Sequence, residues 1–292
     1  MTVIRVGARA SNLAQLQARW VIERLKSAHP ELEFEIVPIR TQGDLDRTTP
    51  LPAMGGRGVF TGEVERALLA GEVDFAVHSL KDLPVADAEG LVIAAVPNRE
   101  DPRDALVTRT GETLSGLAEG AVVGTGSPRR QAQLAAVRPD LVFEPIRGNI
   151  ETRAAKVAAG AYDATVLAVA GLNRSGLAAV VRPIPLGIML PAPGQGALAV
   201  QCRESDIGLR RKLAAIDDPG DRAAVFEERR LLRLIRGGCH APVGALCRRG
   251  PDGWMFEAAV AARPGAPLQR VEVRGDRPQG LADRAFAMLD LA

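Results

Sequence analysis

The residue with the most distinctive chemical setting is Cys239, which lies in Arg236-Gly237-Gly238-Cys239-His240-Ala241-Pro242. Two preceding glycines and a closely following proline exclude the interior of a helix or of a central strand, so the sequence predicts a tight turn that presents the thiol. Arg236 and His240 make this turn electropositive, a setting that favours the nucleophilic thiolate. The local sequence leaves two interpretations open: a reactive cysteine, or a small residue that occupies a turn.

A second group of candidates consists of arginines in glycine-containing loops directly after expected strands. The strand expected at 121–124 runs into Thr125-Gly126-Ser127-Pro128-Arg129-Arg130, and the strand at 141–146 runs into Arg147-Gly148-Asn149, with Arg153 shortly after. A serine followed by proline is typical of a helix N-cap and first helical position, and the free N–H groups of a helix N-terminus attract anions. Ligands of open α/β sheets bind beyond the carboxyl ends of the strands. The sequence therefore predicts a site for a ligand with several carboxylates or phosphates, which guanidinium groups hold through paired hydrogen bonds.

The first half of the chain repeats this arrangement with Arg9 and Ser11, which follow a strand expected at 3–8. A single arginine is readily explained by an ion pair with an aspartate or glutamate of the protein itself. That explanation is less favoured for the whole set of arginines at strand ends. We therefore expect the anionic ligand to lie in a cleft between two domains.

Asp82 is the candidate acid or base. It lies in the loop 78–84, which follows an expected strand at 73–77, and Lys81 precedes it directly. A carboxylate in a basic cleft stays ionised and can stabilise a developing cation or pass a proton. A purely local role in the turn before Pro84 remains open, and His78 is interpreted as a structural histidine rather than a base.

The elements that must position these residues alternate between strand and helix. The expected elements are a helix at 13–27, a strand at 33–40, a polar glycine-containing stretch at 41–60 that is a candidate lid, a helix at 62–70, strands at 73–77 and 91–97, a helix at 152–159 and a strand at 162–169. Gly71-Glu72-Val73-Asp74 resembles Gly160-Ala161-Tyr162-Asp163, since both follow a helix with a glycine and then an aspartate that enters a strand. This indicates two related α/β domains that face each other.

A third region begins near Pro219. It has an expected helix at 222–234, three strands at 241–248, 254–262 and 268–274, and a closing helix at 282–289. The pattern predicts a small α+β domain, within the usual range of domain sizes.

Composition narrows the class of protein. The chain has 292 residues, of which 47% are hydrophobic and 25% charged, and its net charge is only +2, so no overall field points to nucleic acid. No apolar run is long enough to span a membrane, and the N-terminus lacks the pattern of a secretory signal. Three cysteines without close pairing and three scattered histidines favour neither a disulfide framework nor a zinc site. We expect a cytoplasmic protein.

Several ordered segments resemble the porphobilinogen deaminase family, also called hydroxymethylbilane synthases, over nearly the whole chain. They are Ala76-Val77-His78-Ser79-Leu80-Lys81-Asp82-Leu83-Pro84, Glu100-Asp101-Pro102-Arg103-Asp104-Ala105, Arg147-Gly148-Asn149 with Thr152-Arg153, Leu167-Ala168-Val169-Ala170-Gly171-Leu172, Leu190-Pro191-Ala192-Pro193-Gly194-Gln195-Gly196-Ala197, and Gly237-Gly238-Cys239 with Pro242. Several independent motifs in the same order are far more specific than one short glycine pattern.

The resemblance implies an α/β fold with two periplasmic-binding-protein-like βα domains around a cleft and a small α+β C-terminal domain. It divides this chain into residues 1–98 with 197–216, residues 99–196, and residues 217–292. It implies a monomeric cytoplasmic transferase with no nucleic-acid or membrane partner. Such an enzyme joins four porphobilinogen units head to tail with loss of ammonia, and hydrolysis then frees 1-hydroxymethylbilane, a precursor of tetrapyrroles such as heme.

The resemblance also assigns roles to residues of this sequence. Cys239 would carry a covalent dipyrromethane cofactor through a thioether, a tether rather than a catalytic nucleophile, and Asp82 would contact pyrrole nitrogens, stabilise the azafulvene cation left by loss of ammonia and steer protons. The other residues assigned to the cofactor are Lys81, Thr125, Gly126, Ser127, Arg129 and Arg130. The residues assigned to the substrate are Arg9, Ser11, Arg147, Arg153, Arg174 and Gln195, and those of the lid are Arg57 and Phe60.

The chain departs from the family pattern at a few positions. Gly126 stands where serine is usual, which removes one hydroxyl, Asn12 stands where proline is common, and Arg57 replaces a frequent lysine. These differences are expected to tune contacts rather than abolish them. The C-terminus is shorter than in many relatives, which bears on the stability of the third domain.

Two other hypotheses compete with the enzyme. The first is a non-catalytic two-domain anion-binding or effector-sensing module of similar fold, which fold alone does not exclude. The second, a cysteine hydrolase, is weaker because no partner residue is evident for Cys239. The Cys239 turn and the Lys81-Asp82 pair favour the enzyme over the binding module.

Overall fold

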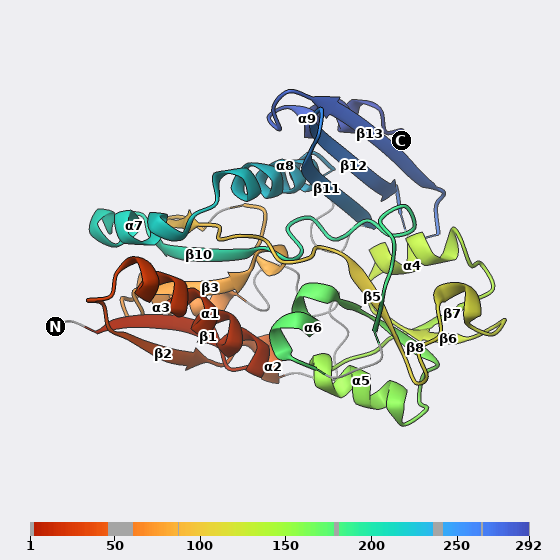
Figure 1. The fold of residues 1–292 in the computed structure, drawn as a ribbon, viewed down its shortest axis with the longest axis horizontal. Coiled ribbons are helices and arrows are strands. Elements are labelled where there is room, and N and C mark those ends of the chain that lie inside the picture. Colours follow the sequence, from red (N-terminus) through yellow and green to blue (C-terminus); the bar gives the residue numbers. More distant parts are fainter. Residues whose placement is uncertain are drawn as a thin grey trace. The chain divides into compact units, whose positions relative to one another are not determined.

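The computed structural model describes residues 3–45, 61–86, 88–177, 181–235, 242–263 and 265–291. The chain divides into two units, Met1–Glu100 with Ala197–Ala223, and Asp101–Gly196 with Ala224–Ala292. The second unit holds both the second sheet and the C-terminal sheet (Figure 1). The division into three domains remains a prediction.

The first unit is built on a five-stranded sheet. Its strands, in spatial order, are β2 (Phe34–Ile39), β1 (Ile4–Arg9), β3 (Phe75–Ser79), β10 (Leu198–Arg203) and β4 (Leu91–Ala95). Its helical segments are α1 (Asn12–Ala28), α2 (Gln42–Leu45), α3 (Gly62–Leu69), η2 (Leu80–Asp82), α7 (Ile207–Leu213) and η4 (Ala214–Ile216). Strand β1 pairs in parallel with β2 and β3, whereas β10 runs antiparallel to β3 and β4.

Helices α1 and α3 cover opposite faces of this sheet. Leu25 of α1 packs in one hydrophobic cluster with Phe75 of β3, and Leu68 of α3 packs in another with Ala76. Neighbouring side chains of a strand point to opposite faces, so the two clusters lie on the two sides of β3. The carboxyl ends of β1 and β3 are adjacent in this sheet, which brings Arg9 and the loop after Ser79 to one edge.

The second unit holds another five-stranded sheet. Its strands, in spatial order, are β7 (Val142–Glu144), β6 (Val122–Gly124), β8 (Ala164–Ala168), β5 (Asp104–Thr108) and β9 (Val181–Pro183). Its helical segments are η3 (Leu114–Gly116), α4 (Pro128–Ala135), α5 (Ile150–Ala158) and α6 (Val169–Ser175). Three parallel strands are again followed by a strand that runs antiparallel to both of its neighbours. The prediction of two related α/β halves is confirmed.

In each half, one aspartate links the start of one strand to the neighbouring strand by the same pair of hydrogen bonds. In the first sheet the backbone N–H of Arg5 donates to the Asp74 carboxylate at 2.8 Å, and the Asp74 N–H donates back to the Arg5 carbonyl at 2.8 Å. In the second sheet Val122 and Asp163 make the matching pair, at 2.7 and 3.0 Å. The sequence likeness around Asp74 and Asp163 therefore reflects the same hydrogen-bonding arrangement in both sheets.

The C-terminal region forms a three-stranded antiparallel sheet. It consists of β11 (Val243–Gly250), β12 (Gly253–Ala261) and β13 (Leu268–Gly275), with the helices α8 (Pro219–Ile235) and α9 (Leu281–Ala287). The predicted small α+β region is confirmed. Leu231 of α8 and Ala285 of α9 pack with Phe256 in its core, and the buried Glu228 of α8 accepts hydrogen bonds from the backbone of Gly194 and Cys247.

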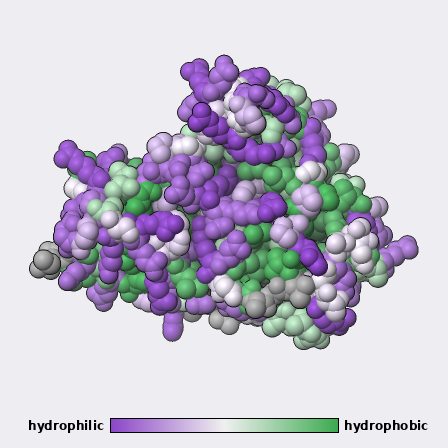
Figure 2. Space-filling model, viewed as in Figure 1, coloured by the Kyte–Doolittle hydropathy of each residue, from purple (hydrophilic) through white to green (hydrophobic). Residues whose placement is uncertain are grey.

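Figure 2 shows hydrophilic side chains over much of the face drawn, with groups of hydrophobic side chains between them, most of these in the right half of the view. The exposed large hydrophobic residues belong to different elements, for example Leu69 of α3 and Ile207 of α7. Among the helices of the described residues, none is long and apolar enough to cross a membrane.

Candidate active site

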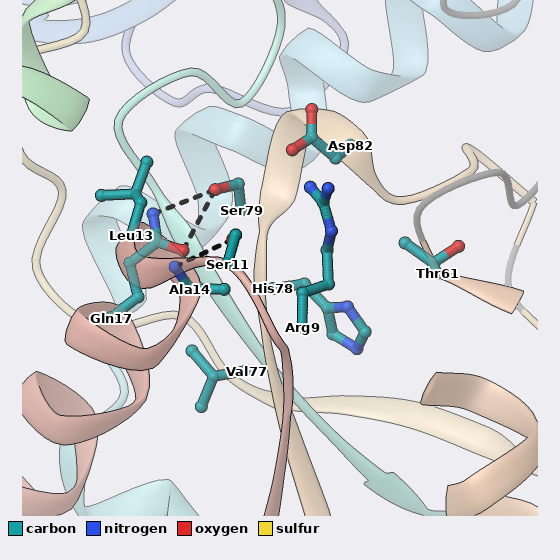
Figure 3. Close-up of a pocket in the computed structure, with 10 residues that line it drawn as sticks. All are labelled: Arg9, Ser11, Leu13, Ala14, Gln17, Thr61, Val77, His78, Ser79 and Asp82. Carbon is teal, nitrogen blue, oxygen red and sulfur yellow. Dashed lines mark hydrogen bonds between the residues drawn. The ribbon is translucent and has the colours of Figure 1, made fainter. Parts of the chain in front are cut away.

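A pocket at the edge of the first sheet gathers the candidate residues of the first unit. Its lining residues are Arg9, Ser11, Leu13, Ala14, Gln17, Thr61, Val77, His78, Ser79 and Asp82. The pocket thus combines the ends of β1 and β3, the N-terminus of α1, the end of η2 and Thr61, which precedes α3 (Figure 3). The Arg9–Ser11 pair and Asp82, which the sequence places on different segments, lie together here.

Ser11 has a structural task besides any role toward a ligand. It is the N-cap of α1, with extended backbone at φ −66° and ψ 146°, and its Oγ accepts a hydrogen bond from Ala14 N at 3.4 Å. Arg9 is the last residue of β1, two positions earlier. Strand end and helix start therefore place a guanidinium and a capped helix N-terminus side by side at the pocket.

The position of Asp82 is set by η2, the segment to which it belongs. Leu80 is fully buried, and its N–H donates to the Ala197 carbonyl at 3.0 Å, so η2 is anchored to the residue before β10. Asp82 is partly exposed, and its carboxylate makes no hydrogen bond or ion pair to a residue that the structure describes. Figure 3 shows the Arg9 guanidinium and the Asp82 carboxylate pointing toward one another at the pocket. Lys81, in the same turn, is half-buried.

Gln17 and Ser79 form a polar contact at the pocket that the sequence analysis missed. The Gln17 amide donates to Ser79 Oγ at 3.1 Å, and the hydroxyl faces the Gln17 carbonyl oxygen at 3.3 Å. Gln17 is almost fully buried, on a face of α1 whose other buried residues are mostly apolar. A polar residue on that face of the helix was the sequence signal for this contact, because buried polar groups require partners.

His78 is buried, and its imidazole is neutral at physiological pH. Its pKa is lowered to about 4, mainly by burial and in smaller part by the charge of Arg9, whereas a contact with Gln201 opposes the shift. Strands β1 and β3 pair in parallel at Val6–Phe75 and Gly7–Ala76, and the charge of Arg9 at the end of β1 acts on the His78 ring. A proton on His78 is therefore disfavoured both by burial and by the adjacent cation.

This burial predicts acid-sensitive stability of the first unit. The unfolded chain protonates His78 near pH 6.5 and the folded chain only near pH 4, so stability is fully present above pH 6.5 and falls by about 3 kcal/mol as the pH drops to 4. His78→Gln, which never takes up this proton, should lose that much less stability over the same interval.

The measurement is urea unfolding at pH 7.0 and 4.5 in a Trp254→Phe background, in which Trp20 fluorescence reports on the first unit. His29→Gln, at a half-exposed histidine of the same unit, is the matched control and should keep the full acid sensitivity. Equal acid sensitivity in His78→Gln and the parent protein would contradict a neutral buried His78.

The loop after β6 is a rigid turn held by its own threonine. Thr125 is buried, its N–H donates to the Glu144 carbonyl at 2.8 Å, and its Oγ1 accepts from Ser127 N at 3.2 Å. Ser127 is the N-cap of α4, but its side chain makes no capping hydrogen bond. At Gly126 an added Cβ would meet no atom within 4 Å, so the usual serine of the family would fit here. The loop thus keeps a hydroxyl and open space beside the start of a helix.

Arg129 and Arg130 of α4 are buried and share one carboxylate, that of Asp104. The Nη1 group of Arg129 donates to Asp104 Oδ2 at 2.7 Å, and the Nη2 group of Arg130 donates to Oδ1 at 2.7 Å. Burial lowers the pKa of Arg129, and the charge of Asp104 opposes that shift. Asp104 belongs to a segment of the family resemblance, yet the sequence analysis gave it no role, because nothing local connects it to residues 25 and 26 positions later.

Gln195 joins the same network. It is fully buried, and its Nε2 donates to the Pro102 carbonyl at 2.7 Å and to Asp104 Oδ1 at 3.1 Å. Arg174 of α6 donates to the Gly196 carbonyl at 2.8 Å, one residue further along the chain. Both residues thus hold the Gly194–Gly196 turn in place.

Arg147 and Arg153 lie around a turn that glycine makes possible. Gly148 has a φ of +114°, and a Cβ at this position would come within 2.7 Å of the Thr152 side chain. The Nε group of Arg153 donates to the Gly148 carbonyl at 2.8 Å, and Asn149 caps α5 by accepting from Thr152 N at 2.9 Å. The turn sets both arginines beside the N-terminus of α5.

Some predicted site residues lie outside the described residues. They are Cys239, Arg57 and Phe60, together with the part of the expected lid from residue 46 to residue 60. Within residues 41–45 the structure shows the short helix α2. Among the residues that the structure describes, no group of three or more His, Cys, Asp or Glu side chains is arranged to hold a metal ion.

Comparison with known proteins identifies the family. Residues 4–211 match the family model described as porphobilinogen deaminase, dipyromethane cofactor binding domain. The chain belongs to the porphobilinogen deaminase family. Similar proteins named porphobilinogen deaminase come from Streptococcus sanguinis, 45% identical over 99% of this chain and 96% of that protein, and from Thermobifida fusca, 52% identical over 93% and 85%. A porphobilinogen deaminase of Bacillus subtilis is 43% identical over 99% and 93%.

Solved structures that match this chain include the effector-binding domain of a BenM variant, 14% identical with a TM-score of 0.42 over 82% of this chain and 98% of that chain. Another is the periplasmic aliphatic sulphonate binding protein SsuA from Escherichia coli, 16% identical with a TM-score of 0.39 over 80% and 70%. The assignment to the porphobilinogen deaminase family rests on the sequence matches.

Proposed function

We propose that this protein is a transferase that joins four molecules of porphobilinogen head to tail, releases one ammonia for each, and frees 1-hydroxymethylbilane by hydrolysis. Membership of the porphobilinogen deaminase family over nearly the whole chain is the observation that carries this proposal. In each coupling the bond between the aminomethyl carbon and nitrogen breaks, and that carbon bonds to the free ring carbon of another pyrrole. The ring proton is then lost, so ammonia and one proton leave for each new carbon–carbon bond.

The dipyrromethane cofactor of the family fits residues of this chain. The buried guanidiniums of Arg129 and Arg130 share the single carboxylate of Asp104, so the cluster keeps one positive charge inside the second unit. A buried charge is stabilised by a partner of opposite charge, which a carboxylate of the cofactor would supply. When bound, the cofactor supplies the pyrrole carbon to which the first substrate unit is joined. We assign its thioether attachment to Cys239. The side chains and backbone assigned to its carboxylates are Lys81, Thr125, Gly126, Ser127, Arg129 and Arg130.

Substrate carboxylates are assigned to residues of both units. Arg9 and Ser11 lie together at the first pocket, and Arg147 and Arg153 flank one turn of the second unit. Arg174 and Gln195 contribute from the segments around the Gly194–Gly196 turn. Porphobilinogen carries an acetate and a propionate, which planar guanidinium groups hold at defined angles. Holding two pyrroles in this way converts an encounter in solution into a reaction between positioned carbons.

Asp82 is assigned the catalytic role. Loss of ammonia leaves positive charge on the substrate pyrrole, and a fixed carboxylate at the pocket stabilises that charge. The anchoring of Leu80 by Ala197 keeps the Asp82 segment in place during the reaction. The same carboxylate can then accept the proton that the attacking pyrrole loses.

The remaining parts of the proposal concern organisation and setting. We assign three domains with the boundaries given above, a lid over 41–60 that includes Arg57 and Phe60, and a monomeric enzyme that binds neither nucleic acid nor membrane. The proposal includes a reducing cytoplasmic setting, and it is supported by Cys202, a buried free thiol.

The test is mass spectrometry of the intact purified protein during reaction with porphobilinogen. We expect a starting mass above the bare 30.9 kDa chain by one dipyrromethane, stepwise gains of one pyrrole unit, and release of ammonia and a linear tetrapyrrole. An anion-binding or effector-sensing module would bind porphobilinogen without ammonia release. That result would overturn the enzymatic proposal.

A further inference from the structure

Asp104 is a buried charged residue to which the proposed reaction assigns no direct role. It is the first residue of β5, it is fully buried, and its backbone is fixed by pairing with Ala168 and by the N–H of Ile184, which donates to its carbonyl at 2.8 Å. Burying an unpaired carboxylate costs free energy, so a buried carboxylate needs partners. The identity of these partners indicates what Asp104 does. Those partners come from two separate segments of the chain.

The side chains of three described residues donate to the Asp104 carboxylate. Arg130 donates through Nε at 3.1 Å and Nη2 at 2.7 Å, and Arg129 donates through Nη1 at 2.7 Å. Gln195 adds its amide at 3.1 Å. All three were selected for the ligand site from the sequence, so one carboxylate orients three site residues from α4 and from the turn before β10.

The two arginines differ in how many of their nitrogens the protein holds by hydrogen bonds. Every nitrogen of Arg130 already donates a hydrogen bond, two to Asp104 and Nη1 to the Val166 carbonyl at 2.7 Å. Arg129 is held at one end only, where Nη1 donates to Asp104 and to the Leu190 carbonyl at 2.8 Å. Its Nε and Nη2 groups make no hydrogen bond to a residue that the structure describes. Asp104 therefore fixes the Arg129 guanidinium by one nitrogen and leaves its other donors for a ligand.

The net charge of the cluster also favours the binding of a carboxylate from a ligand. Two guanidiniums and one carboxylate carry a net single positive charge in a buried place. A second carboxylate, from a ligand, would balance this charge, whereas without Asp104 the two guanidiniums would repel each other. A fork that is held in place beforehand loses less entropy when it binds a carboxylate.

We propose that Asp104 is a positioning residue that sets the direction and net charge of the Arg129–Arg130 pair for a carboxylate of the bound pyrrole chain. This inference rests on the proposed function. Asp104 touches neither substrate nor cofactor and acts through the two arginines and Gln195.

The test compares Asp104→Asn with the wild-type protein and with Asp140→Asn. Asp140 pairs with Arg138 at 2.6 Å near the surface of the same unit, so it controls for the loss of one paired aspartate. The readouts are the fraction of purified protein that carries the cofactor, by intact mass, and KM and kcat for porphobilinogen. For Asp104→Asn we expect a lower cofactor-bearing fraction and a KM raised about tenfold, the effect of losing one charged hydrogen bond.

Asp104→Glu provides a second route in case the asparagine variant does not fold. It keeps the charge but displaces the carboxylate by one methylene, so we expect a melting temperature closer to wild type and the same defects in cofactor content and KM. A folded Asp104→Asn or Asp104→Glu protein with wild-type cofactor content and KM would overturn the positioning role. Failure of the wild-type protein itself to consume porphobilinogen would instead overturn the proposed function.

Discussion

Replacing Cys239 with serine is expected to leave a protein with the bare mass of 30.9 kDa and no turnover of porphobilinogen. Serine keeps the size of the side chain but removes the nucleophilic sulfur, so the thioether cannot form. Loss of the tether also removes the positioning of the growing chain, and we expect turnover to fall by at least about 1,000-fold. Intact mass under denaturing conditions and ammonia release measure the two effects.

Cys202→Ala is the matched control for the tether. Cys202 is fully buried in β10, and burial raises the pKa of its thiol to about 11, so it is a poor nucleophile. This variant should carry the cofactor as the wild-type protein does. A cofactor mass that persists in Cys239→Ser would place the attachment elsewhere.

Asp82→Asn is expected to fold and to bind porphobilinogen, but to turn it over about 100- to 1,000-fold more slowly, because a fixed charge that stabilises the transition state is lost. The change retains the shape of the side chain while removing its charge and its ability to accept a proton. The effect should fall on kcat rather than on KM, because the carboxylate groups of the substrate are assigned to other residues. Steady-state kinetics and circular dichroism provide the measurement.

The control for Asp82 is Glu89→Gln, which removes an exposed carboxylate of the same unit outside the pocket. It should keep wild-type kinetics. Full activity of Asp82→Asn would show that another group stabilises the developing charge. A rise in KM with unchanged kcat would move Asp82 from a catalytic role to a binding role.

Much of the fold followed from local sequence. Periodic apolar residues and glycine stops predicted alternating strands and helices, and the likeness around Asp74 and Asp163 predicted two related halves, which the matching strand orders confirm. These predictions succeeded because they depend on residues that are close in the sequence. A glycine ends a helix, and the aspartate that follows it bonds to the first strand of its sheet. Their positions after expected strands also selected Arg9, Ser11 and Asp82, which the structure brings to one pocket.

What the sequence could not determine was which charged residues would find partners inside the protein. Local sequence placed Arg129 and Arg130 at the start of a helix, but only the tertiary structure showed both guanidiniums on Asp104, together with Gln195 from a segment 91 residues away. Burial of His78, and with it the neutral imidazole, likewise depends on the packing of β3 between β1 and β10. The sequence by itself determined the elements and the chemical types of the site residues. The tertiary structure decided their partners, burial and charge, because these depend on desolvation and on contacts between residues far apart in the chain.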